Sequence, residues 1–292
     1  TTPRFVLTTP RFVLRTLMKD KMKTFKIYAF EYFLIVAVAL LSIAGFWKIF
    51  FGAEAKPTAY HFLHITTVFV WLGLLLVQLS LIGKKSGFGH KTLGLSILFF
   101  GPLLFASTAV MSVHSAYKGV VSGEGDALLV QNVMGALELG FLILMAFVLR
   151  KKRAIHGAFL VSTTLLFMGI AIFFTLLAWV PQFKIEGPET FNRFGMAAFA
   201  GLAVGLVIGI IFVIRNRRNG WPILLGGSFL LINQIIHGLL GGFGLLKPLT
   251  EFIGSLNEIA TFVISFVVLA ILLILTGVLK GRQAVHPQPE IS

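Results

Sequence analysis

Eight runs of about 20 apolar residues, separated by short polar segments, constrain the fold of this chain more than any other feature. The runs lie at about 28–51, 59–83, 92–114, 127–149, 155–180, 195–214, 221–245 and 255–279. An α-helix of about 20 apolar residues spans the hydrocarbon core of a bilayer. The chain is only 12% charged, whereas soluble domains average about 25%. We therefore predict an all-α membrane protein with about eight transmembrane helices.

The connections between the runs are too short to hold a separate soluble domain. Residues 28–280 are therefore predicted to form a single transmembrane domain, with a four-helix core made by the second to fifth runs. Residues 1–27 form a basic N-terminal segment and residues 281–292 a tail. Residues 1–7 recur unchanged as residues 8–14, and we interpret this duplication as an artefact. The first run is longer than the apolar part of a signal peptide, so we expect it to be an uncleaved anchor.

Charge predicts the orientation. The net charge is +14, and in a membrane protein such an excess is better explained by the positive-inside rule than by a nucleic-acid partner. With eight spans, 19 of the 25 lysines and arginines fall on the side of the two termini. The six on the other side are Lys48, Lys56, Lys118, Lys184, Arg193 and Lys247. Both termini are therefore expected in the cytoplasm of a bacterium, with the chain in the inner membrane. The chain has no cysteine, which excludes disulfides and iron–sulfur clusters.

Histidines fall into two layers of the predicted bilayer. The outer layer contains His61 and His64 at the start of the second run, His114 at the end of the third, and His237 deep in the seventh. The inner layer contains the other two histidines of the spans, His90 and His156, each at the start of a helix that leaves a basic turn. Ionisable groups within membrane spans are costly, and they mark functional sites by default.

Several other polar residues are predicted to face the bundle interior. His64, Trp71 and Gln78 recur every seven residues and share one stripe of their helix, as Gln131 and Glu138 do on theirs. Asn233 and Gln234 lie four and three residues before His237, on the same helix face. Glycines of the sixth run, at positions 195, 201, 205 and 209, form a small-residue stripe that indicates close helix packing. Glycine pairs at 226–227 and 241–242 are expected to break the seventh helix.

The two layers of histidines suggest two haem irons, because imidazole is a common axial ligand of haem. His90 and His156 would hold the inner haem, and His64 or His61 with His114 the outer one. Two alternatives remain open. Interfacial histidines can lie near headgroups without any ligand. The four outer histidines could instead form a zinc site, with Glu138 or Glu258 as the base.

The pattern His64-x6-Trp71-x6-Gln78, His90-x3-Gly94 and the basic turn ending at His156 resembles a widespread bacterial family of multi-spanning membrane proteins of unknown function. It covers about residues 59–175. It is also distantly similar to the ascorbate-reducible transmembrane cytochrome b family, whose four-helix core carries two haems held by histidines on alternate helices. The resemblance implies that His90 and His156 bind haem b. The fourth run has no histidine, so the outer pair departs from that family's pattern.

These observations lead to one main functional hypothesis and two others. The main one is a haem b-binding electron carrier of the bilayer that works with a quinone or another membrane subunit. The second is a non-catalytic subunit or assembly factor of a larger respiratory complex. The third is a small-molecule transporter, against which stands the lack of a pair of broken helices in inverted repeats.

Overall fold

The computed structural model describes residues 10–83 and 86–282, and side chains from residue 28 onwards and up to residue 276. Within this part the chain is helical, with no strand. The helices are α1 Pro10–Phe51, α2 Ala59–Gly83, α3 Gly87–Ser122, α4 Leu129–Val148, α5 Arg153–Trp179, η1 Pro181–Phe183, η2 Pro188–Thr190, α6 Asn192–Arg215, α7 Trp221–Gly242, α8 Leu246–Gly254 and α9 Glu258–Arg282. Predictions about the first copy of the repeat, the Lys84–Lys85 pair and most of the tail lie outside the described residues.

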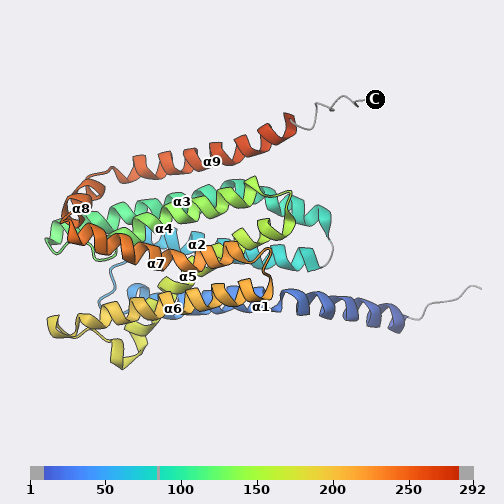
Figure 1. Cartoon of the computed structure of the whole chain (residues 1–292), viewed down its shortest axis with the longest axis horizontal. Helices are drawn as coiled ribbons and strands as arrows, with labels where there is room; N and C mark the ends of the chain where they lie inside the picture. Colours follow the sequence, from blue (N-terminus) through green and yellow to red (C-terminus); the bar gives the residue numbers. More distant parts are fainter. Residues whose placement is uncertain (1–9, 84–85, 283–292) are drawn as a thin grey trace, which may run out of the picture.

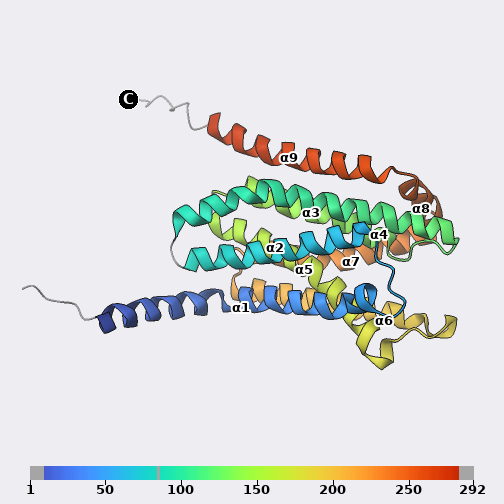
Figure 2. The same cartoon turned by 180° about the vertical axis from the view of Figure 1, so that it is seen from behind.

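Eight of these helices are long and apolar enough to cross a membrane, which confirms the predicted fold class. They run side by side along the long axis of the molecule (Figures 1 and 2). α1 is kinked at Tyr28, where the membrane-spanning part begins. The predicted break at Gly226–Gly227 is wrong, because α7 continues through both residues. A short helix that was not predicted, α8, separates α7 from α9.

The four-helix core is made by α2, α3, α4 and α5, as predicted. Each packs against the next, and α5 closes the group against α2, so α3 and α5 lie at opposite corners. The closing contact is polar: the indole N–H of Trp71 on α2 donates to Thr163 Oγ1 on α5 at 2.8 Å. Both side chains are fully buried. A hydrogen bond between two groups that have no access to water fixes which faces of α2 and α5 meet.

The remaining helices cover this core. α1 packs on α5 and α2, α6 and α7 pack on α5, and α9 packs on α3. α9 is the most peripheral of these helices. Only 11% of its most apolar 18-residue stretch is buried inside the protein, whereas the figure for α5 is 61%. Apolar side chains on such an outer helix are suited to contact with lipid tails.

The molecule has two chemically different ends. We call one the basic end, because the α4–α5 turn, Arg150 to Arg153, and the α6–α7 turn, with Arg217 and Arg218, lie there. The end opposite the basic end contains the loops that follow α1, α3, α5 and α7. Seven of the chain's eleven acidic residues lie there. They are Glu54, Glu124, Asp126, Glu186, Glu189, Glu251 and Glu258.

The glycines of α6 let its backbone approach two other helices closely. A Cβ atom added to Gly201 would lie 2.5 Å from the carbonyl oxygen of Gly169 on α5. One added to Gly209 would lie 2.9 Å from the backbone of Leu224 on α7. The predicted small-residue stripe is therefore a packing surface. Gly195, the first residue of the stripe, has open space around it.

Gly201→Leu is expected to destabilise the protein by about 1–3 kcal/mol, the usual cost of overpacking a filled core. The obstacle is backbone, so α5 and α6 must separate to admit the side chain. Thermal unfolding in detergent measures the loss. Gly195→Leu is the control on the same helix and is expected to leave the midpoint nearly unchanged. Equal midpoints for the two variants would contradict the packing described here.

Candidate functional site

A cavity of about 290 Å3 lies among seven helices, α1 to α7. It lies in the half of the bundle that is farther from the basic end. Its wall contains seven polar side chains with amide or imidazole groups. They are His61, His64, Gln131, Asn132, Asn233, Gln234 and His237. Of the described residues that line it, none is Asp, Glu, Lys or Arg. The cavity is therefore polar in places but carries no permanent charge.

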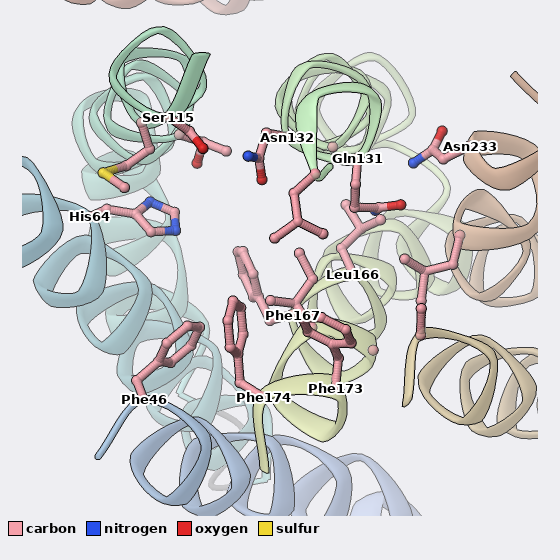
Figure 3. Close-up of a pocket in the computed structure, with 18 of the residues that line it drawn as sticks. Phe46, His64, Ser115, Gln131, Asn132, Leu166, Phe167, Phe173, Phe174 and Asn233 are labelled. Carbon is pink, nitrogen blue, oxygen red and sulfur yellow. The ribbon is translucent and has the colours of Figure 1, made fainter. Parts of the chain in front are cut away.

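The polar groups are spread across the cavity (Figure 3). His64 lies on one side and Asn233 on the other, with Gln131 and Asn132 of α4 between them. Three hydroxyl side chains, Ser42, Thr108 and Ser115, also line the cavity, and the rest of the wall is apolar and rich in aromatic rings from α1, α5 and α6. The rings are Phe46, Phe50, Phe167, Phe173, Phe174 and Phe194. A mostly apolar wall with a few polar groups is typical of small-molecule sites.

A second hollow of about 440 Å3, which we call the vestibule, lies next to the cavity. The vestibule lies at the end of the molecule opposite the basic end. Charged residues line it, among them Lys118, Glu124 and Asp126. Six residues line both spaces. They are His61, Met111, Ser115, Ala127, Leu128 and Phe194. These shared residues lie between the two spaces, and we call them the neck.

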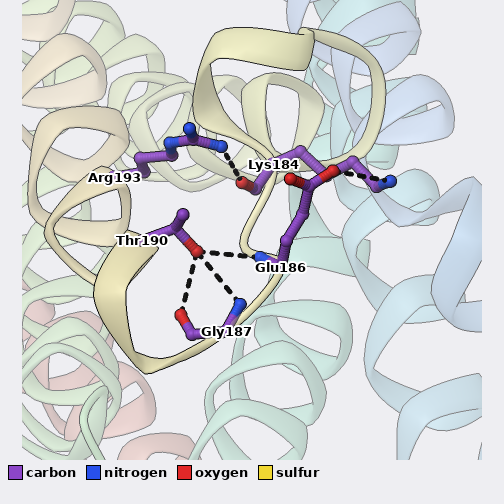
Figure 4. A network of polar contacts seen from close by, with 5 residues as sticks. All are labelled: Lys184, Glu186, Gly187, Thr190 and Arg193. Atoms are coloured by element: carbon purple, nitrogen blue, oxygen red, sulfur yellow. Dashed lines mark hydrogen bonds and ion pairs between the residues drawn. The ribbon is translucent and has the colours of Figure 1, made fainter.

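The aromatic residue of the neck, Phe194, follows directly after the loop between α5 and α6. Polar contacts order this loop (Figure 4). Thr190 Oγ1 accepts hydrogen bonds from the backbone N–H groups of Glu186 and Gly187, at 2.9 and 3.1 Å. Arg193 donates to the carbonyl oxygen of Lys184 at 2.7 Å. α6 begins at Asn192, directly after the loop. The bonds within the loop therefore fix the position of Phe194, in the first turn of α6.

Phe194 packs against two other rings. Its ring stacks on Phe191 at 5.5 Å between centroids and meets Phe173 of the cavity wall at 4.8 Å. The ordered α5–α6 loop thus places an aromatic side chain between cavity and vestibule.

A chain of polar contacts leads from α9 to the other side of the neck. Glu258 Oε1 lies 2.9 Å from His114 Nδ1. Thr58 Oγ1 lies 3.4 Å from His114 Nε2 and 2.7 Å from His61 Nδ1. The Thr58 backbone N–H also donates to His61 Nδ1, at 3.1 Å, so this nitrogen is an acceptor and the His61 proton is on Nε2. The chain joins α9, α3 and α2 at one point.

Glu138 lies behind the cavity wall. Its side chain is 6% exposed, and its Oε2 accepts a hydrogen bond from Asn233 Nδ2 at 3.2 Å. Asn233 is itself 1% exposed, and its Oδ1 has no partner among the described residues. Gln131 Oε1 is likewise buried and unpaired. Two residues of the cavity wall thus have acceptor oxygens without a donor.

His90 and His156 lie at the basic end, at the starts of α3 and α5. Their side chains are close enough to interact electrostatically. His156 Nδ1 lies 2.7 Å from the carbonyl oxygen of Ala146, so Nδ1 carries the proton and Nε2 is left with a free lone pair. His90 Nδ1 is buried without a partner among the described residues. Gln78 beside it donates to the His90 carbonyl oxygen at 3.3 Å.

The donor atoms of this pair are of the kind that bind a haem iron. Metal-binding histidines commonly donate their other N–H to a backbone carbonyl, as His156 does. Arg153 interacts electrostatically with His90, and Arg150 with His156. Guanidinium groups are good partners for carboxylates such as haem propionates. Gln78 Oε1 is also buried and unpaired, and such atoms are rare in proteins unless a further group is present.

The outer histidines are arranged differently from the predicted haem pair. The rings of His61 and His114 meet edge to face, 5.6 Å between centroids. His64 lies in the cavity wall, where its Nδ1 is 3.4 Å from Ser107 Oγ. Among the described residues, no three His, Cys, Asp or Glu side chains come close enough to share a metal ion. The zinc alternative therefore has no support from the geometry.

Sequence reasoning found most of the polar cavity wall and missed its aromatic part. His61, His64, Gln131, Asn233, Gln234 and His237 were singled out, and all six line the cavity. Asn132, Thr58 and Phe194 were missed. The cluster of phenylalanines at 167, 173 and 174 was a signal, but such clusters more often reflect lipid contact or core packing. Searches of protein-family models, of curated proteins and of solved structures found no match for this chain.

Proposed function

We propose that this protein is an electron carrier of the membrane that holds haem b between His90 and His156. The observation that carries the proposal is the 2.7 Å contact of His156 Nδ1 with the Ala146 carbonyl oxygen. It fixes the imidazole in the tautomer that binds iron through Nε2, and it fixes the plane of the ring.

The four-helix core supplies the rest of the site. His90 and His156 start helices at opposite corners of the core, so they approach the same space from two sides. Arg150 and Arg153 would neutralise the haem propionates. Haem b would supply a one-electron iron couple. The protein's part is to orient the two imidazoles and to keep the iron at the depth where α3 and α5 begin.

The redox partner would reach the iron from the basic end or through the lipid. We propose a quinone or a second membrane protein for this role, with the chain in a bacterial inner membrane. Apolar side chains on α1 and α9 that point away from the bundle support a lipid environment: Phe33 is 70% exposed and Ile259 is 71% exposed.

The orientation follows from charge. The positive-inside rule puts the basic end in the cytoplasm. An alkaline phosphatase, active only in the periplasm, is therefore expected to be inactive when fused to Ser292 and active when inserted after Glu124, in the α3–α4 loop. Phosphatase activity of intact cells measures both. The reverse pattern would contradict the orientation but not the fold.

The haem content of the purified protein tests the proposal, together with that of His90→Ala and His156→Ala. We expect bound haem b in the wild type and its loss in both variants. Full haem content in both variants would contradict it.

A further inference from the structure

The wall of the cavity contains an imidazole nitrogen, His64 Nε2, that no other group of the described residues uses. We infer that the cavity binds a small neutral aromatic molecule that donates a hydrogen bond to this nitrogen. The inference goes beyond the haem proposal and is independent of it, since its residues lie in the other half of the bundle.

His64 Nε2 is open to the cavity. The residue lines the cavity, and its ring points into the space (Figure 3). The side chain of His64 is partly exposed, and Nε2 has no hydrogen-bond partner among the described residues. Gln131 Oε1 and Asn233 Oδ1 are also unpaired but fully buried, whereas His64 Nε2 is not. A molecule in the cavity therefore reaches this nitrogen.

The hydrogen bonds behind the ring make Nε2 an acceptor. Ser107 Oγ lies 3.4 Å from His64 Nδ1. The single proton of this hydroxyl has two nearer acceptors, the Leu104 carbonyl oxygen at 2.9 Å and Thr67 Oγ1 at 2.7 Å. Ser107 Oγ therefore accepts a hydrogen bond from His64 Nδ1. No carboxylate lines the cavity to stabilise a protonated ring, so the proton is on Nδ1 and Nε2 keeps its lone pair.

This lone pair sets the main requirement on the ligand. An occupant of the cavity displaces water from His64 Nε2, and it loses affinity when it cannot replace the hydrogen bond of that water. An O–H or N–H group at this point keeps the bond, whereas a methyl ether does not. Asn132, which also lines the cavity, has an amide that can either donate or accept, so it adapts to the rest of the molecule.

The remainder of the wall favours a neutral aromatic ligand. The described residues that line the cavity include no Asp, Glu, Lys or Arg, so an ionic ligand would have no opposite charge to pair with. Six phenylalanines line the same space, and their rings favour other flat rings through offset stacking or edge-to-face contacts. A volume of about 290 Å3 is near the lower limit of small-molecule sites. The occupant is therefore of the size of one or two fused rings.

Three naphthalene probes test these properties. 2-Naphthol is neutral and has one donor, 2-methoxynaphthalene is neutral without a donor, and 2-naphthoate is an anion. Binding to the protein in lipid nanodiscs would be followed by probe fluorescence, with empty nanodiscs as the background. We expect saturable binding of 2-naphthol at one site per protein and binding of the methyl ether that is weaker by about tenfold, the effect of losing one hydrogen bond. The anion is expected to show no saturable binding.

His64→Leu tests the acceptor. It should weaken binding of 2-naphthol by about tenfold and leave binding of the methyl ether unchanged, so that the two affinities become equal. The ratio is measured within one variant, so it does not depend on the fraction of protein that folds. The matched control is His237→Leu, which removes another imidazole of the cavity wall and should keep the preference for 2-naphthol.

Two glycine variants test the location. Gly135 lines the cavity, and a Cβ added there meets nothing within 4 Å, so Gly135→Leu fills the space without pressing on the backbone. It is expected to abolish saturable binding of 2-naphthol. Gly73→Leu, at an equally open glycine of α2 that lines neither space, should bind the probe as the wild type does.

Several results would overturn the inference. They are no saturable binding of 2-naphthol to the wild type, saturable binding of the anion, a preference for 2-naphthol that survives in His64→Leu or is lost in His237→Leu, and wild-type binding by Gly135→Leu.

Discussion

The His156→Ala variant is expected to purify without haem b, whereas the wild type retains it. The reason is the arrangement of the imidazole, which the 2.7 Å contact of its Nδ1 with the Ala146 carbonyl orients. No other histidine among the described residues lies at the basic end except His90, so no substitute ligand is near. Haem content per protein, measured as the pyridine haemochrome, gives the result.

Loss of haem could also follow from misfolding, and two controls separate the causes. His237→Ala removes an imidazole from the cavity wall at the other half of the bundle, and it should keep full haem content. His156→Gly prepared with free imidazole should regain haem and a low-spin spectrum, because the added imidazole occupies the place of the lost ring. Rescue by imidazole would not occur if His156 only supported the fold.

The second large effect concerns stability. Asn233→Leu is expected to lower the free energy of unfolding by about 3 kcal/mol, the upper range for leaving a buried polar group unpaired. Asn233 Nδ2 is the only side-chain hydrogen-bond partner of Glu138 among the described residues, and Glu138 is 6% exposed. Removing the amide leaves the buried Glu138 carboxyl group without that hydrogen bond.

The double variant distinguishes this explanation from a simple packing defect. Glu138→Leu combined with Asn233→Leu removes both polar groups, so most of the lost stability should return. Thermal or denaturant unfolding of the four proteins in the same detergent gives the coupling energy between the two sites. If the double variant is less stable than Asn233→Leu alone, the hydrogen bond is not the source of the effect.

Much of the fold could be predicted from the sequence because hydropathy is a strong signal in membrane proteins. Each long apolar run became a helix, and the spacing of His64, Trp71 and Gln78 correctly placed them on the face of α2 toward the core. The small-residue stripe of α6 also packs as its spacing indicates. These predictions depend only on the helical period and on the cost of exposing polar groups to lipid.

What could not be predicted depends on contacts between distant parts of the chain. His114 and Glu258 are 144 residues apart and meet only because α9 packs on α3. Gly226 and Gly227 looked like a helix break, because glycine disfavours helices in water. In α7 they are close-packing positions: a Cβ on Gly226 would lie 2.9 Å from the Ser162 carbonyl oxygen. The close packing of neighbouring helices therefore outweighs the low helix preference of these two glycines.

The cavity shows the same limit. Its wall combines single residues from seven helices, and no local pattern reports where seven helices leave a space. The polar members could be found, because an amide or imidazole in a membrane span stands out. The aromatic members could not, because a phenylalanine in such a span is ordinary.

The visible absorption spectrum of the wild-type protein, purified from cells supplied with haem precursor, tests the central claim most directly. Two imidazole ligands give a low-spin haem, so the account predicts a Soret band together with sharp α and β bands on reduction. Both should be absent from His90→Ala and His156→Ala. A well-folded wild-type protein without a Soret band would contradict the claim that His90 and His156 hold haem b.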